Sequence, residues 1–412
     1  MLYEQRAHLR RLQPAELELL LRSALAAGYE VAYWFKRTQE GAIDRDAIVL
    51  AGLASENWRT RAGAVAALGQ LGDRYSAQII ARLADDYPQV RIAAIHTLER
   101  VQPDGAWRQH LQYECYVPAG SFIMGDDEGE SDQKPAHAVY LDAYYIGKYP
   151  VTNADYQRYM ADRGRTFSFA AGREDHPAVY ISWFDAAEYA EWAGVRLPTE
   201  AEWEKAASWE KSDKVTRWQG DKVKGRKRTY PWGDRFDKRK CNSEEAGIGG
   251  TTPVGAYSPA GDSPYGAADM AGNVWEWCAD WYAADSYRTS PRTNPTGPVN
   301  GYGRVLRGGA YYTDQGRDCC CVRGYDLPSS RAAGSSTAAC GCVRPPLLCP
   351  LIPLALWALK NDVYGIKQPA RRSGGGVQRG RAPSGARLRV CAWRAILLLL
   401  LRFAVAVGTA GR

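Results

Sequence analysis

Cysteine is the residue type in this chain best suited to do chemistry, and its distribution is uneven. A thiolate attacks electrophiles and binds soft metal ions. Of ten cysteines, Cys115, Cys241 and Cys278 precede residue 300, and the others follow it: Cys319, Cys320, Cys321, Cys340, Cys342, Cys349 and Cys391. Because no Cys-x-x-Cys pair has a partner pair at zinc spacing, free thiols in a reducing compartment are favoured over a metal site built from 319–321 and 340–342.

The helices that would position functional side chains can be located from their caps and apolar spacing. Ser182 is the predicted N-cap of one helix. Four of its apolar residues share the spacing of a single buried face: Ala187, Tyr189, Ala190 and Trp192. A second helix is predicted to begin after Thr199, with Glu202 at the capping-box position.

These helices belong to a series of motifs between residues 113 and 309 that resembles the sulfatase-modifying-factor (formylglycine-generating enzyme) family. The motifs follow the family's order: Tyr116–Gly125, Tyr145–Tyr156, Val179–Trp192, Arg196–Glu204, Tyr230–Gly233, Gly266–Tyr282 and Arg304–Gly309. The resemblance implies an α+β, C-type-lectin-like domain of formylglycine-generating-enzyme type. We assign it residues 113–344.

The resemblance also indicates what is missing. In the family a pair of cysteines beyond the Arg-Gly-Gly segment binds copper and performs an oxidation, and here Thr313 and Asp318 stand at those places. Neither side chain can replace a thiolate, so no catalytic residue and no copper are expected.

A structural calcium site is implied by the same resemblance. Its ligands would be the side chains of Asp269 and Glu276 and the carbonyls of Gly272 and Val274. Oxygen ligands from a tight, glycine-containing loop suit a hard cation. A second family site would map near Asn242, Ser243 and Ile248, but its acidic ligand falls on Ala246, which makes that site doubtful.

The tract 310–342 has an unusual composition. It lacks Lys, Glu, Met and Trp, and every residue except Gln315 belongs to the set encoded by codons that end in a pyrimidine. Arg317, Arg323, Pro328 and Arg331 interrupt the tract as fixed positions would. This pattern resembles the variable region of a diversity-generating-retroelement variable protein, a group with the same C-type-lectin-like fold. A drifted enzyme terminus is the alternative, and an adenine-rich near-copy of the coding segment beside a reverse transcriptase gene would distinguish the two.

We therefore predict a non-catalytic protein that binds an unknown protein or other macromolecule through this diversified surface. Tyrosine offers a large contact area with few torsions, and small polar residues adapt to a partner. The predicted contact residues are Tyr311, Tyr312, Thr313, Asp314, Asp318, Cys319, Cys321, Gly324, Tyr325, Asp326, Leu327, Ser329 and Ser330.

The rival hypothesis is an enzyme of the sulfatase-modifying-factor type, or a related one that acts on cysteine or other sulfur substrates. The first kind needs the missing cysteine pair. The second needs three clustered histidines, and the five histidines show no such spacing: His8, His96, His110, His137 and His176.

Residues 1–112 are predicted to form a separate α-helical, HEAT-like domain. Pro14–Leu25 has the apolar period of an amphipathic helix. Arg61–Leu68 and Arg91–Leu98 form an internal repeat at an offset of 30, as stacked helical repeats do. The alternatives are a docking domain for a partner and an ordinary helical bundle.

The net charge and the composition of the two ends of the chain give predictions about partners and location. The formal net charge is +7, and the basic excess lies after Arg344. This is not a nucleic-acid-binding balance, so no nucleic acid partner is expected. The start of the chain lacks the apolar run of a secretory signal peptide, which predicts a cytoplasmic protein. Residues 345–412 form a basic and apolar low-complexity tail, whose apolar run 395–401 is shorter than the ~20 residues of a spanning helix. Membrane association through this tail stays open.

Overall fold

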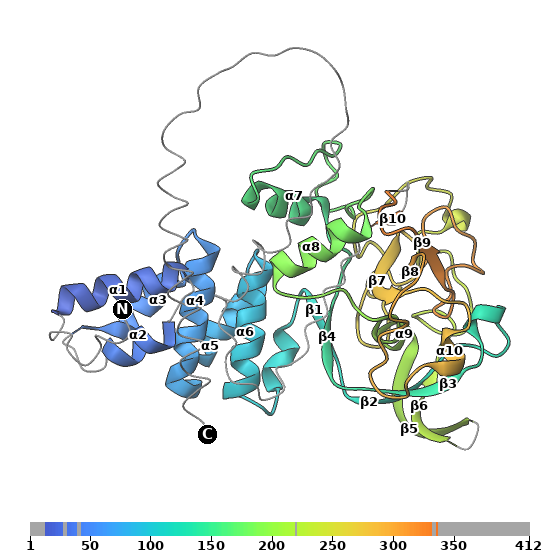
Figure 1. The fold of residues 1–412 in the computed structure, drawn as a ribbon, viewed down its shortest axis with the longest axis horizontal. Coiled ribbons are helices and arrows are strands. Elements are labelled where there is room, and N and C mark those ends of the chain that lie inside the picture. The colour runs from blue at the N-terminus through green and yellow to red at the C-terminus, as the bar shows by residue number, and fades with distance from the viewer. Residues whose placement is uncertain (1–12, 28–30, 39–42, 219–220, 332–334, 337–412) are drawn as a thin grey trace, which may run out of the picture.

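The computed structural model describes residues 13–27, 31–38, 43–218, 221–331 and 335–336. The predictions for the tail, and for the tract after residue 331 apart from 335–336, lie outside these residues. Helices α1 to α6 form a layer on one side of the molecule, and most strands lie on the other side (Figure 1). Within the described part of the chain, no helix has both the length and the apolar character needed to cross a membrane.

The helical layer agrees with the predicted repeat. Helix α1 (Pro14–Ala27) begins at Pro14, where the fixed φ of proline suits a first turn. The repeated segments lie in α4 (Trp58–Leu68) and α6 (Pro88–Val101), which pack against each other around fully buried aliphatic side chains. The other helices of the layer are α2 (Val31–Arg37), α3 (Arg45–Gly52) and α5 (Ser76–Ile80).

The two repeat units use the same arginine contact. Arg61 Nη1 donates to the carbonyls of residues 55 and 56 (2.8 and 3.0 Å), and its guanidinium pairs with Asp85 of the next unit (2.8 Å). Arg91, thirty residues later, donates to the carbonyls of residues 85 and 86 (2.9 and 3.4 Å) and pairs with Glu114 (2.9 Å). Glu114 opens the first strand, so the α+β domain stacks on the second unit much as that unit stacks on the first.

The α+β domain starts with two antiparallel pairs of strands. Strand β1 (Glu114–Val117) pairs with β4 (Tyr144–Gly147), and β2 (Gly120–Met124) pairs with β3 (His137–Leu141). Tyr145 of β4 is fully buried and stacks on Trp107 at a centroid distance of 6.2 Å. The helical layer and the strands therefore share buried apolar contacts.

Three helices follow, and two of them begin at the predicted caps. They are α7 (Asn153–Asp162), α8 (Trp183–Ala193) and α9 (Glu200–Ser208). Ser182 and Asp185 form a capping box on α8, and Thr199 and Glu202 form one on α9. Every residue of α9 is buried, which makes it the central helix of the domain.

A four-stranded sheet and a hairpin complete the α+β fold and confirm the predicted class. The sheet order is β10 (Ser335–Ser336), β7 (Trp275–Trp281), β8 (Arg304–Arg307) and β9 (Gly324–Asp326). Strands β7, β8 and β9 are antiparallel, and β10 runs parallel to β7. The hairpin consists of β5 (Trp209–Trp218) and β6 (Asp221–Lys227), and a short helix, α10 (Ser286–Thr289), follows β7.

Candidate functional site

The predicted variable tract follows β8, and Arg307 at the end of that strand holds its backbone. The Arg307 guanidinium is fully buried and donates to the carbonyls of Cys320 (2.9 Å), Cys321 (2.9 Å) and Val322 (2.7 Å). It also forms an ion pair with Glu204 of α9. Burial alone would raise the pKa of Glu204, but the cations of Lys227 and Arg307 lower it to about 2. This part of the tract is therefore fixed through main-chain atoms.

Three of the four residues that interrupt the tract bind the scaffold. Arg323 pairs with Glu200 through two contacts of 2.7 and 3.0 Å and is itself buried. The carbonyl of Pro328 accepts a hydrogen bond from the Trp183 amide (3.1 Å). Arg331 pairs with Asp185 at 2.7 Å. The fourth residue, Arg317, is exposed.

Thr313 and Asp318 form a buried pair at the start of the tract. Thr313 Oγ1 donates to Asp318 Oδ1 at 2.5 Å, and both side chains are shielded from solvent. Burial raises the pKa of Asp318 to about 8, and its second oxygen, Oδ2, is buried without a hydrogen-bond partner. A Cβ on Gly309 would collide with Asp318 Oδ1, which explains the glycine there. The two oxygen groups offer neither a nucleophilic thiolate nor a soft metal ligand.

Some of the predicted contact residues are therefore not on the surface. Thr313, Asp318 and Cys321 are buried in this structure, so their contact with a ligand stays a prediction without an exposed surface to support it. They are buried because the backbone turns inward where Thr313 bonds Asp318 and Arg307 holds the chain. Five predicted residues are half-buried: Tyr311, Cys319, Gly324, Asp326 and Ser330.

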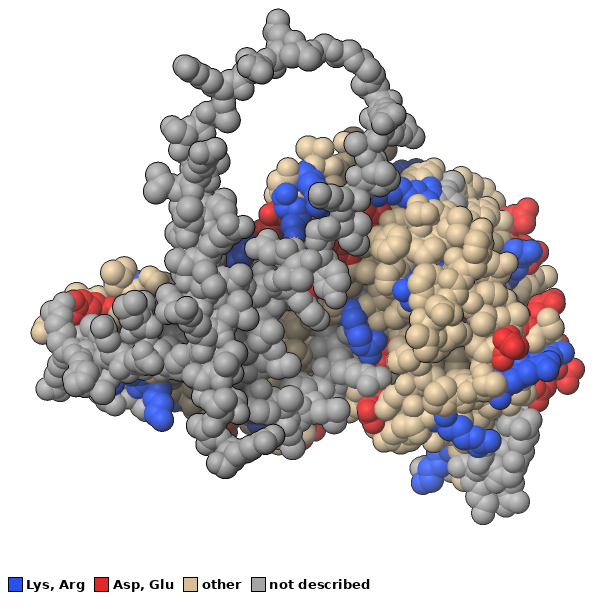
Figure 2. Space-filling model, in the orientation of Figure 1, with Lys and Arg blue, Asp and Glu red and all other residues tan. Residues whose placement is uncertain are grey.

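The other predicted contact residues are exposed. Tyr312, Tyr325 and Leu327 present 46, 54 and 40% of their surface, and Asp314 and Ser329 are also exposed. Tyr325 stacks on Tyr282 of the scaffold at a centroid distance of 4.2 Å. The face over β8 and β9 is mostly uncharged, with acidic and basic side chains gathered at its edge (Figure 2).

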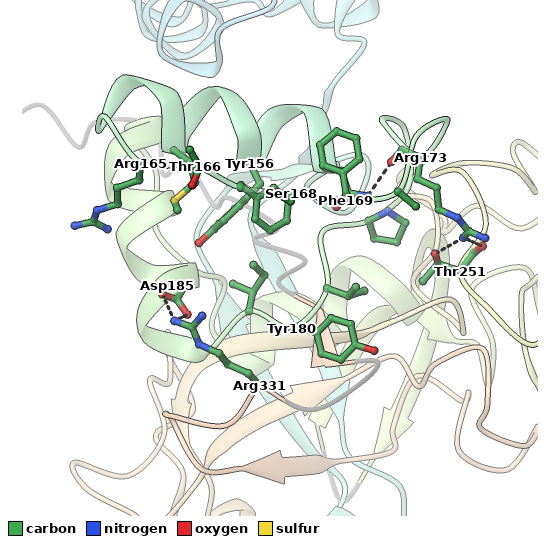
Figure 3. A pocket seen from close by; sticks show the side chains of 17 residues that line it. Tyr156, Arg165, Thr166, Ser168, Phe169, Arg173, Tyr180, Asp185, Thr251 and Arg331 are labelled. Atoms are coloured by element: carbon green, nitrogen blue, oxygen red, sulfur yellow. Dashed lines mark hydrogen bonds and ion pairs between the residues drawn. The ribbon is translucent and has the colours of Figure 1, made fainter. Parts of the chain in front are cut away.

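A pocket of about 610 Å³ lies beside the tract, between α7, the start of α8 and residues 165–181. Phe167, Phe169 and Tyr180 line it with apolar surface. The ion pair of Arg331 with Asp185 borders one side, and Arg173 with Thr251 borders another (Figure 3). Arg331 of the tract therefore forms part of the pocket lining.

Sequence analysis missed this pocket. Tyr180 is 55% exposed and has a φ of 63°, a left-handed conformation that is uncommon for a bulky residue. Such strain persists only where the surrounding structure enforces it and is concentrated at functional sites. No local pattern reveals a tyrosine in this conformation. The only available signal was the aromatic run 167–169 next to Arg165 and Arg173.

The predicted oxygen-ligand loop contains buried carboxylates that have no cationic partner. Trp203 Nε1 donates to Glu276 Oε2 at 2.6 Å, while Glu276 Oε1 is buried without a partner. Asp269 Oδ2 accepts from the Gly255 amide at 2.7 Å. Burial raises the pKa of Asp269 to about 6 and that of Glu276 to about 8. A buried carboxylate oxygen that lacks a partner fits a hard cation.

The described residues contain no metal site that is built from side chains alone. Among the residues that the structure describes, no group of three or more His, Cys, Asp or Glu side chains could hold a metal ion. A site at Asp269 and Glu276 would therefore depend on the carbonyls of Gly272 and Val274. The Gly272 carbonyl already accepts a hydrogen bond from the Val274 amide at 2.8 Å.

The helices and strands after residue 113 form an α+β domain of the formylglycine-generating-enzyme type. Residues 100–335 match the sulfatase-modifying factor enzyme 1-like domain, and the chain belongs to this family.

Curated relatives match about half of the chain, and one solved structure resembles it. The formylglycine-generating enzyme of Streptomyces coelicolor is 36% identical over 274 residues, which cover 53% of this chain and 85% of that enzyme. The serine/threonine-protein kinase pkn1 of Chlamydia caviae is 36% identical over 237 residues, 52% of this chain. The chain spans about a third (34%) of the length of that kinase. The solved structure of Treponema denticola variable protein 1 is 22% identical and covers 57% of this chain and 95% of that one, with a TM-score of 0.46.

Proposed function

We propose that the chain is a non-catalytic ligand-binding protein that displays the tract 310–342 on its C-type-lectin-like scaffold. The main support is the buried pair of Thr313 and Asp318 at the places where the family resemblance implies two cysteines. An alcohol and a carboxyl group joined by a 2.5 Å hydrogen bond cannot bind a soft metal or act as a thiol.

The way the tract is anchored supports diversification of its side chains. Arg307 binds carbonyl groups, which are present whatever residue occupies positions 320–322. Arg323, Pro328 and Arg331 bind the scaffold at fixed points, while Tyr325 and Ser329 lie between these points and are exposed. Tyr312, which precedes them, is exposed as well. A surface loop on a rigid scaffold can change its sequence without loss of the fold.

The pocket suggests what the ligand presents. An aromatic or branched apolar side chain would fit against Phe167, Phe169 and Tyr180, and arginines at the rim would favour acidic neighbours. We therefore propose a protein ligand that inserts an apolar side chain beside the tyrosine surface. A separate partner on the helical layer stays a prediction.

The rival proposal is an enzyme that oxidises cysteine or acts on another sulfur substrate. It is favoured by the 36% identity to a formylglycine-generating enzyme. The two proposals differ in what the site at Thr313 and Asp318 can do.

Catalytic silence is the expected result when the purified protein is incubated with copper and a sulfatase-type peptide. The peptide cysteine should stay unmodified because no thiolate is available at positions 313 and 318. Mass spectrometry of the peptide measures the conversion, and the Streptomyces coelicolor enzyme serves as the positive control. Formylglycine formed by this protein would reject the non-catalytic proposal.

We also propose that calcium binds the loop of Asp269, Gly272, Val274 and Glu276. The unpartnered Glu276 Oε1 and the raised pKa values of both carboxylates support this site. Its role would be to stabilise the loop that leads into β7.

Calcium is expected to change how stability depends on pH. Since both carboxyl groups have folded-state pKa values above their unfolded values, their contribution to stability is present at low pH and is lost as pH rises through about 6 and about 8. Bound calcium should reverse this loss, because the ion binds the ionised carboxylates. A hundredfold excess over Kd adds about 2.7 kcal/mol.

The measurement is the melting temperature with calcium or with chelator, from about pH 5 to about pH 8. The Asp269→Asn variant is the control and should not respond to calcium. A wild-type melting temperature that chelator leaves unchanged at the upper end of this range would remove the site.

A further inference from the structure

Cys319 and Cys321 lie side by side in the turn after the Thr313–Asp318 pair. Their Sγ atoms are 3.1 Å apart, and the turn is closed by a hydrogen bond from the Val322 amide to the Cys319 carbonyl (3.1 Å). Arg307 holds the carbonyls of residues 320–322 and therefore fixes this turn. Cys320, between them, is fully buried. The fold thus brings two thiols together and keeps the third inside.

The thiol pair can be reached from solvent. A second pocket of about 500 Å³ is lined by Cys319 and Cys321 together with Lys134 and Arg288. Cys319 is half-buried, while Cys321 is almost fully covered. A small reagent that enters this pocket would therefore meet Cys319 first. The pocket also contains three carboxylates, those of Asp126, Glu128 and Glu130, so its lining carries charges of both signs.

The surroundings give the two thiols different roles. Cys321 Sγ lies 3.7 Å from Asp126 Oδ2, a carboxylate that can accept its proton. The hydrogen bond from Cys321 lowers the pKa of Cys319 to about 7 against the opposing effect of burial, and that bond together with burial raises the pKa of Cys321. Cys319, the more exposed thiol, is therefore the one with the lowered pKa, and Cys321 is the thiol that lies next to a carboxylate.

We propose that Cys319 and Cys321 form a reversible dithiol–disulfide pair that reacts with low-molecular-weight disulfides of the glutathione type. Cys319 thiolate attacks one sulfur of the reagent and releases one reagent thiolate, which leaves a mixed disulfide on Cys319. Asp126 accepts the proton of Cys321, whose thiolate then attacks Cys319 Sγ and expels the second reagent thiolate. The two protein sulfurs are oxidised to a disulfide and the reagent disulfide is reduced to two thiols; one product thiolate takes the Cys321 proton from Asp126, and the other takes a proton from solvent.

This inference does not depend on the proposed ligand-binding function. It differs from the family oxidation because it uses positions 319 and 321 and involves no metal. The buried Thr313–Asp318 pair takes no part in it.

The experiment uses the reduced full chain and oxidised glutathione as the probe, near neutral pH. Tryptic cleavage after Arg317 and Arg323 releases the peptide 318–323, which contains all three neighbouring cysteines. This peptide is expected to lose two hydrogen atoms in mass and to regain them with a reductant. In the untreated protein, Cys319 should be alkylated on the order of tenfold faster than Cys115, whose pKa burial raises to about 12.

Three matched variants identify the reacting pair. The Cys320→Ser variant should still close the disulfide. The Cys321→Ser variant should keep a persistent glutathione adduct on Cys319, and the Cys319→Ser variant should form neither product at a comparable rate. A wild-type peptide 318–323 that stays reduced would overturn the proposal. So would loss of closure in Cys320→Ser, or alkylation of native Cys319 no faster than that of Cys115.

Discussion

Replacement of Arg307 by methionine is expected to lower the free energy of unfolding by about 3–5 kcal/mol, the cost of breaking a buried ion pair from one side. Arg307 is fully buried, and its removal leaves Glu204 with Lys227 as its remaining cation, at 2.7 Å. Three carbonyls of the tract would also lose their donor. Chemical denaturation of the two proteins measures the difference.

Arg317→Met provides the matched control, because Arg317 lies on the exposed side of the same tract. Its effect should stay within about 0.5 kcal/mol. If Arg307→Met costs no more than this control, the tract is not anchored through its backbone as we infer. The proposed tolerance of the tract's exposed positions to sequence change would then have no physical basis.

Most of the scaffold could be predicted from the sequence because its determinants are local or ordered along the chain. The capping boxes of Ser182 and Thr199 each lie within four residues, so a short window reveals them. The arginine repeat at 61 and 91 also has a fixed offset. The family motifs then supply the order of strands that no local pattern determines.

The site was predicted less well because its geometry depends on contacts between distant segments. How deeply Thr313 and Asp318 are buried depends on the ion pair of Arg307 with Glu204, which lies 103 residues earlier. The pocket around Tyr180 needs α7, α8 and Arg331 to meet. A tract without regular periodicity does not indicate which side chains face inward. The sequence alone therefore could not show that Tyr312 is exposed and Thr313 is buried.

Trp277→Ala is expected to destabilise the protein by about 3–5 kcal/mol, as truncation of a large buried aromatic side chain does. Trp277 on β7 is fully buried, and its Nε1 donates to the Ile181 carbonyl at 3.1 Å. Trp275, two residues earlier, is only half-buried, so its truncation should cost less. Thermal and chemical denaturation measure both.

The combined change Tyr312→Ser and Tyr325→Ser should have a much smaller effect on stability, below about 1.5 kcal/mol. Both rings are about half exposed, and the main loss is the stacking of Tyr325 on Tyr282. Tyr311 is left unchanged because it is half-buried. If the double variant unfolds as Trp277→Ala does, these tyrosines belong to the core and the binding-surface proposal fails. If it stays folded, the two exposed tyrosines can be replaced without loss of the fold. The stability of the protein then comes from the buried scaffold beneath them, as a surface that varies in sequence requires.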